Sequence, residues 1–86
     1  MLCLLQKFFL ELLLFQQKKY TEAAQRMEEV LRIESTPSGV MLEHYGDILY
    51  HLNRVPEALS WWKKAQESPE GSDKLALKIQ TSTYHE

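Results

Sequence analysis

Residues 42–65 read LEHYGDILYHLNRVPEALSWWKKA, and the spacing of large and small residues in this stretch decides the fold. The first half contains the pattern Leu42-x-x-Tyr45-Gly46-x-x-Leu49, in which apolar residues three or four positions apart indicate one face of a helix. Glycine in a helix interior costs roughly 0.5 to 1 kcal/mol relative to alanine. Gly46 therefore predicts that another helix approaches this one closely.

The second half of the stretch contains the pattern Ala58-x-x-x-Trp62-x-x-Ala65. Ala58 and Ala65 lie seven residues apart on one helical face and Trp62 falls between them, so two small side chains flank one large ring. Pro56 stands just before this pattern, where the first turn of a helix tolerates proline. The stretch therefore predicts two helices joined by a short turn.

A weaker copy of the same pattern lies 35 residues upstream. In this copy, Lys7 and Glu11 replace the first large residue and the glycine. The matching upstream positions are Leu10, Leu14, Ala23, Met27 and Val30, which correspond to Tyr45, Leu49, Ala58, Trp62 and Ala65. The chain therefore contains two repeats of one helical hairpin.

These motifs resemble the tetratricopeptide repeat (TPR) family, and most closely the closing repeats of bacterial TPR arrays. The resemblance implies an all-α fold, a TPR-like α-α superhelix of two helical hairpins plus a C-terminal cap helix, in a single domain over residues 1–86. Repeat 1 then covers about 4–35, repeat 2 about 38–69 and the cap helix about 72–81. The packing slots of the family fall on Leu42, Tyr45, Gly46, Leu49, Ala58, Trp62 and Ala65.

Helical periodicity places the individual helices near residues 4–17, 21–34, 38–53, 56–68 and 72–81. In the last of these, Leu75, Leu77 and Ile79 alternate with Lys74 and Lys78. We interpret this segment as a cap with a polar outer surface, which the end of a stacked helical array needs for solubility.

One polar face of the helix over 38–53 carries Glu43, Asp47 and His51 at spacings of four residues. Two carboxylates and an imidazole at this spacing could ligate a divalent metal, but no second supplier of ligands is evident. We therefore interpret the three residues as a solvated face and expect no metal site.

Composition limits the classes of function. The chain has 86 residues, and its 10 basic and 12 acidic residues form no basic cluster, so nucleic acid is not an expected partner. Cys3 is the only cysteine and no positively charged neighbour activates it as a nucleophile. We expect no catalytic residue, no cofactor and no enzyme activity.

The first 15 residues include 12 apolar ones, interrupted by Lys7 and Glu11. This stretch is shorter and more charged than the roughly 20 apolar residues of a membrane span, and it lacks the flanks of a signal peptide. One neighbouring helix cannot cover so apolar a helix. A second copy of the chain, an upstream repeat or a hydrophobic ligand could do so, through contacts with Leu5, Phe8, Leu12 and Phe15.

In the TPR family the first helices of successive repeats line a concave groove that binds peptides or helices of partner proteins. The resemblance places Val40, Glu43, Asp47, Tyr50 and His51 in this groove, and Leu5, Phe8, Leu12, Phe15 and Gln16 from the first repeat. Because Glu43 and Asp47 are acidic, we expect a partner segment with basic and apolar residues.

The sequence thus predicts a non-catalytic protein-interaction or scaffolding module that binds a protein or peptide. The alternative is the terminal fragment of a longer TPR array with a structural role, which packs or self-associates as a homodimer through its apolar first helix. Membrane-surface attachment through residues 1–15 is a third class. A cytoplasmic location is expected if the chain is complete as given.

Overall fold

The computed structural model describes the backbone of residues 4–68 and 74–83, and within these ranges the side chains from residue 10 onward. The described residues form five α-helices and no strand, as the sequence predicts. The helices are α1 (Leu4–Gln16), α2 (Tyr20–Ile33), α3 (Gly39–His51), α4 (Val55–Gln66) and α5 (Leu75–Thr81). The predicted start of the cap helix at residue 72 lies outside the described residues.

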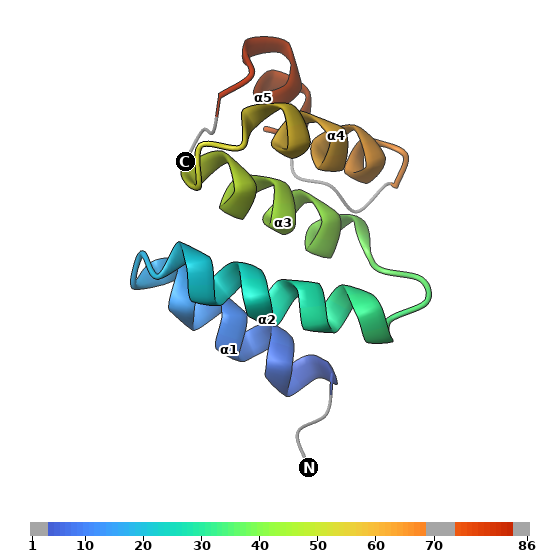
Figure 1. The fold of residues 1–86 in the computed structure, drawn as a ribbon. Coiled ribbons are helices and arrows are strands. Elements are labelled where there is room, and N and C mark those ends of the chain that lie inside the picture. The colour runs from blue at the N-terminus through green and yellow to red at the C-terminus, as the bar shows by residue number, and fades with distance from the viewer. Residues whose placement is uncertain (1–3, 69–73, 84–86) are drawn as a thin grey trace. The chain divides into compact units, whose positions relative to one another are not determined.

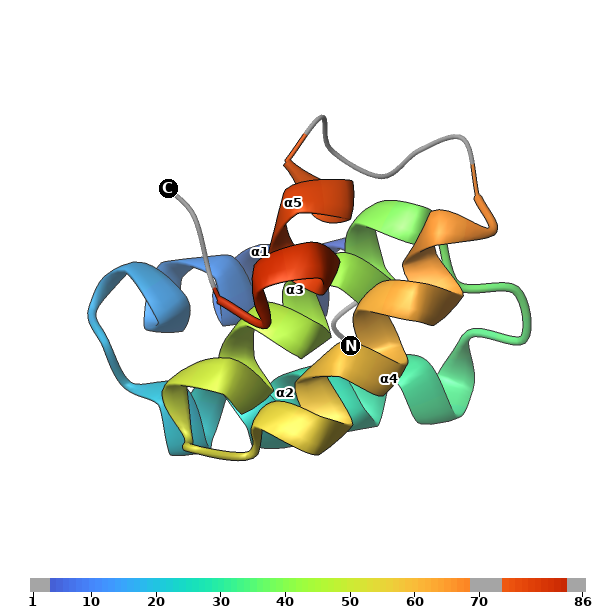
Figure 2. The ribbon, with the colours of Figure 1, turned by 90° about the horizontal axis from the view of Figure 1, so that it is seen from above.

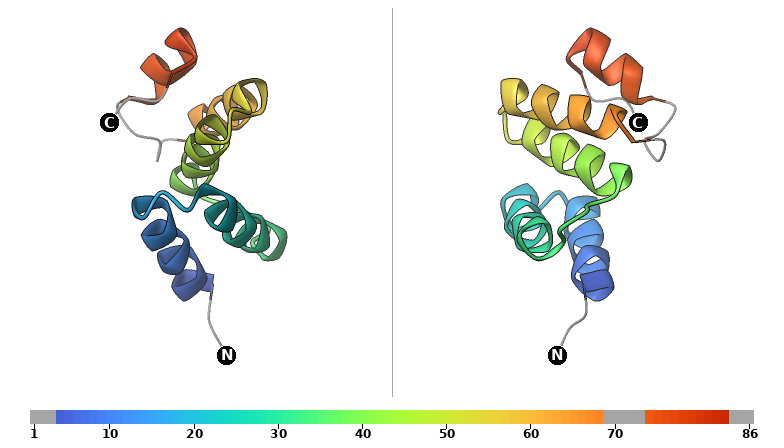
Figure 3. Two further views of the ribbon diagram at one scale, coloured as in Figure 1. Left: turned by 60° about the vertical axis from the view of Figure 1, so that its left-hand side comes forward. Right: turned by 90° about the vertical axis from the view of Figure 1, so that its right-hand side faces the viewer.

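The chain divides into two compact units, Met1–Pro37 and Ser38–Glu86, and each is described by itself. In the first unit, α1 and α2 lie side by side and run in opposite directions (Figure 1). In the second, α3 and α4 form a hairpin of the same kind, and α5 packs against α4 (Figures 2 and 3). Each predicted repeat therefore corresponds to one antiparallel helical hairpin.

The two hairpins turn in the same way at equivalent positions. Lys18 and Asn53, which are 35 residues apart, both have a φ of 62°, a left-handed conformation that few residues other than glycine adopt. The amide of Lys18 donates to the carbonyl of Phe15 at 2.9 Å, and the amide of Asn53 donates to that of Tyr50 at 3.0 Å. The next amides make matching hydrogen bonds. The amide of Lys19 donates to the carbonyl of Leu14, and the amide of Arg54 donates to that of Leu49, each at 2.9 Å.

Start signals in the sequence explain the positions of α3 and α4. The Ser38 hydroxyl accepts a hydrogen bond from the Met41 amide at 3.2 Å and so caps the first turn of α3. Pro56 lies in the first turn of α4, where its missing amide proton costs nothing. Arg54 pairs with Glu57 across that turn through two hydrogen bonds of 2.9 and 2.5 Å.

The core of the second hairpin depends on close contact between Gly46 and Trp62. A β-carbon placed on Gly46 would lie 2.4 Å from Cδ1 and 2.5 Å from Nε1 of Trp62, and 3.1 Å from the carbonyl oxygen of Ala58. Only glycine leaves room for the ring at this position, so the predicted close approach is confirmed. Six of the seven predicted packing residues are buried, namely Tyr45, Gly46, Leu49, Ala58, Trp62 and Ala65, whereas Leu42 is half-buried.

The first hairpin fills the equivalent slots differently. Met27 occupies the Trp62 slot and Glu11 the Gly46 slot, and both side chains are fully buried. The flanking slots keep small or medium residues, Ala23 and Val30, which are also fully buried. Methionine is unbranched and flexible, so this slot does not require a glycine opposite it. The departure at Glu11 therefore accompanies the replacement of tryptophan by methionine.

We expect Gly46→Ala to lower the free energy of unfolding by about 1 to 3 kcal/mol, because overpacking against Trp62 outweighs the gain in helix propensity. Tryptophan fluorescence during urea unfolding measures this directly, since both tryptophans lie in α4. The control is Gly46→Ala combined with Trp62→Met, whose cost should be smaller than the sum of the two single substitutions. An unchanged or higher stability of Gly46→Ala would contradict the predicted contact.

Candidate functional site

The most unusual site in the second unit is a buried group of charges. Glu43 and Asp47 lie one helical turn apart on α3 and are only 6% and 7% exposed. The interpretation of this face as solvated is therefore wrong. Carboxylates are rarely buried unless a partner compensates the lost hydration. That partner is Lys78 of α5, itself 4% exposed.

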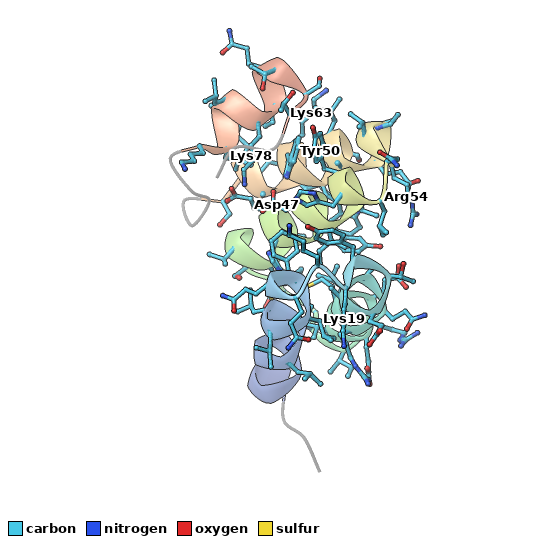
Figure 4. All side chains as sticks on the ribbon, turned by 90° about the vertical axis from the view of Figure 1, so that its left-hand side faces the viewer. Lys19, Asp47, Tyr50, Arg54, Lys63 and Lys78 are labelled. Atoms are coloured by element: carbon cyan, nitrogen blue, oxygen red, sulfur yellow. The ribbon has the colours of Figure 1, made fainter. Side chains whose placement is uncertain are left out.

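Lys78 binds both carboxylates at once. Its Nζ donates to Oε2 of Glu43 at 2.6 Å and to Oδ1 of Asp47 at 2.9 Å. Figure 4 shows Lys78 of α5 and Asp47 of α3 pointing toward each other. The Nε1 proton of Trp62 adds a hydrogen bond to the same Asp47 oxygen at 3.0 Å. Side chains from α3, α4 and α5 therefore meet at Asp47.

Burial and ion pairing shift the pKa values of Asp47 and Lys78 in opposite directions. Desolvation raises the pKa of Asp47 above its usual 3.8, although the ammonium of Lys78 lowers it in part. Burial alone would lower the pKa of Lys78, but the hydrogen bonds and charges of Glu43 and Asp47 outweigh it and hold the pKa above 10.5. Lys78 therefore stays charged across the neutral range.

The face of α5 that carries this lysine differs from the one the sequence suggested. Leu75 and Lys78 are buried, whereas Leu77 is 44% exposed and Ile79 half-buried. The expectation that Lys78 belongs to the polar outer surface of this helix is wrong. Alternating residues share a face in a strand and not in a helix. A helix places residues three and four apart on one face, so Leu75 and Lys78 point the same way.

The remaining predicted groove residues have varied surroundings. Tyr50 is half-buried and stacks on Trp62, with ring centroids 6.1 Å apart. His51 is half-buried and meets the Tyr50 ring edge-on at 5.5 Å. Val40 at the start of α3 is 49% exposed. The five residues thus divide into two charges held by Lys78, two packed rings and one exposed apolar side chain.

The described part of α1 is apolar and only partly covered. Leu12 and Phe15 are half-buried, and Leu13 is 45% exposed. Phe15 meets Tyr20 edge-on with ring centroids 5.5 Å apart. The side chains of Leu5 and Phe8 lie outside the described residues. Gln16, the last predicted groove residue of this helix, is exposed.

Within the described ranges, no three or more histidine, cysteine, aspartate or glutamate side chains gather where they could hold a metal ion. None of the helices formed by these residues has both the length and the apolar character needed to cross a membrane. Comparison with known proteins finds no matching family model, curated protein or solved structure.

We expect Lys78→Met to destabilise the second unit by about 3 to 5 kcal/mol, because it leaves two buried carboxylates without their cation. The matched control is Lys74→Met, which removes an exposed lysine just before α5 and should change stability by less than about 0.5 kcal/mol. Urea unfolding followed by tryptophan fluorescence measures both. Equal stabilities of the two variants would show that the buried charges contribute nothing specific.

The raised pKa of Asp47 predicts a pH dependence of stability. As the pH rises from 3.8 through the raised value, the unfolded chain loses its proton before the folded chain does, so this residue's contribution to the free energy of unfolding falls. Asp47→Asn removes that dependence. We expect the variant to match the wild-type chain below pH 3.8 and to gain relative stability above it. Urea unfolding of both proteins over a pH series tests this, and a relative loss would mean that ionised Asp47 stabilises the fold.

Proposed function

We propose that this chain is a non-catalytic scaffolding module of the TPR kind, whose two hairpins stack as in a TPR superhelix. The observation that carries the proposal is the matched hairpin turn, with left-handed Lys18 and Asn53 and the same hydrogen bonds 35 residues apart. The repeated placement of Ala23 and Ala58 in fully buried slots supports it. One supersecondary unit used twice is the basis of repeat architectures.

The polar groups of the second unit support a role without catalysis. A general acid or base must reach the proton of a substrate, and a nucleophile must be accessible. Glu43, Asp47 and Lys78 are instead buried and bind one another. Their arrangement is suited to holding α5 on the hairpin.

We propose that the module associates through the apolar face of α1, with a second copy of the chain as the partner that is tested first. In the described part of α1, the only fully buried side chain is Glu11, while Leu13 is 45% exposed. Covering one leucine or phenylalanine side chain contributes roughly 1.5 to 3 kcal/mol. Association that covers Leu13 and the half-buried Leu12 and Phe15 would gain part of this amount for each side chain. Glu43 and Asp47 are buried and bound by Lys78, so a peptide could reach those two carboxylates only in place of α5.

We expect light scattering after size exclusion to show a dimer whose fraction rises with protein concentration. Leu13→Gln should weaken the dimer about tenfold or more, because each 1.4 kcal/mol of lost burial changes the dissociation constant tenfold. Leu77→Gln is the matched control, since Leu77 is 44% exposed on α5. It should leave the dimer unchanged. A monomer at all concentrations, or equal effects of the two variants, would contradict association through α1.

A further inference from the structure

We propose that the surface of α3 and α4 beneath α5 is a binding site for a helix of another protein that carries an apolar residue followed three positions later by a lysine. In this structure α5 occupies the site from within the same chain. The proposal goes beyond association through α1, because it concerns a different helix and a different chemistry.

The charges define the cation that the site selects. Glu43 and Asp47 supply two carboxylates one turn apart, and a single ammonium, that of Lys78, binds both. With both acids ionised, these three groups keep a formal excess of one negative charge. The Trp62 indole donates to Asp47 and holds that carboxylate in position. A lysine from any helix of matching shape would find the same two acceptors and the same ring, which lies 5.9 Å from Nζ.

The apolar part of the site is defined by Leu75. Its side chain is 4% exposed, and it precedes Lys78 by three residues, so both enter the hairpin surface from one face of α5. Leu77 on another face is 44% exposed and contributes little. Leu75 and Lys78 are the two buried side chains of α5, and they define the partner as a helix with an apolar-x-x-Lys pattern.

The attachment of α5 depends on its two buried side chains more than on the stability of the helix itself. The helix has seven residues, and helices shorter than about 12 to 15 residues are marginal without tertiary contacts. A longer partner helix with the same two anchors would compete with α5 for the site.

The test uses the full chain and a synthetic peptide with the sequence of residues 74–83, KLALKIQTST. The readout is the Nε1 proton resonance of Trp62, because this group donates to Asp47 inside the site. The resonance of Trp61 is an internal reference, since its ring instead contacts Tyr45 and Lys64. A control peptide carries methionine in place of the central lysine.

Charge reversal by Lys78→Glu should release α5 and expose the carboxylates to the peptide. We expect the peptide to shift the Trp62 resonance of this variant at a concentration at least about tenfold lower than for the wild-type chain, where α5 competes. The methionine peptide should bind roughly thirtyfold or more weakly, the loss typical of truncating one partner of a buried charge pair.

Leu75→Ser provides a second variant in case Lys78→Glu unfolds the unit, because it removes the apolar anchor and keeps all three charged groups. It should also bind the lysine peptide more tightly than the wild-type chain does. The proposal is overturned if the Trp62 resonance shows no lysine-dependent shift in the wild-type chain at millimolar peptide and none in either variant. The proposal is also overturned if the wild-type chain forms a dimer that Lys78→Glu abolishes and Leu13→Gln does not. In that case α5 of a second copy would be the occupant of the site. Failure of the α1 dimer alone leaves this prediction unaffected.

Discussion

The structure of the second unit depends on one buried ammonium held between two carboxylates. Glu43 and Asp47 leave water only because Lys78 reaches both, at 2.6 and 2.9 Å. Buried ion pairs are a weak source of net stability, since desolvation offsets most of the attraction, but removal of one partner is costly. The charges therefore determine where α5 sits more than how tightly the unit folds. Trp62 extends the same constraint into α4, because its indole proton bonds to Asp47.

The indole also links this charge cluster to the packing of the hairpin. Trp62 fits only because Gly46 has no side chain. Its Nε1–H donates a hydrogen bond to Asp47, the residue that follows Gly46 in the sequence. The first hairpin, with Met27 and Glu11 in the equivalent slots, has neither the ring nor the glycine. The two hairpins thus share their turns and their small buried residues, yet only the second has the tryptophan that positions Asp47.

Sequence reasoning could predict the parts of the fold that depend on local spacing. The five helices, the turn before α4 and the close contact at Gly46 all follow from apolar periodicity, proline position and residue size. It missed the role of Lys78, because an acidic pair four residues apart has the same spacing on a solvated face as in a buried site. The useful signal was the helical register of α5, which places Leu75 and Lys78 together. Which carboxylates that lysine would meet depended on tertiary packing.

A lysine at this position gives α5 a property that leucine could not give it. An apolar side chain would pack against any apolar part of α3 and α4. A seven-residue helix held only in this way could slide or rotate at little cost in free energy. The ammonium of Lys78 is stable in the interior only where Glu43 and Asp47 both accept its hydrogen bonds, so a shift of one residue would leave three charges poorly paired. The same requirement that holds α5 in one register would make the uncovered surface reject helices without a matching cation. Specific attachment and selective recognition then follow from the same two hydrogen bonds.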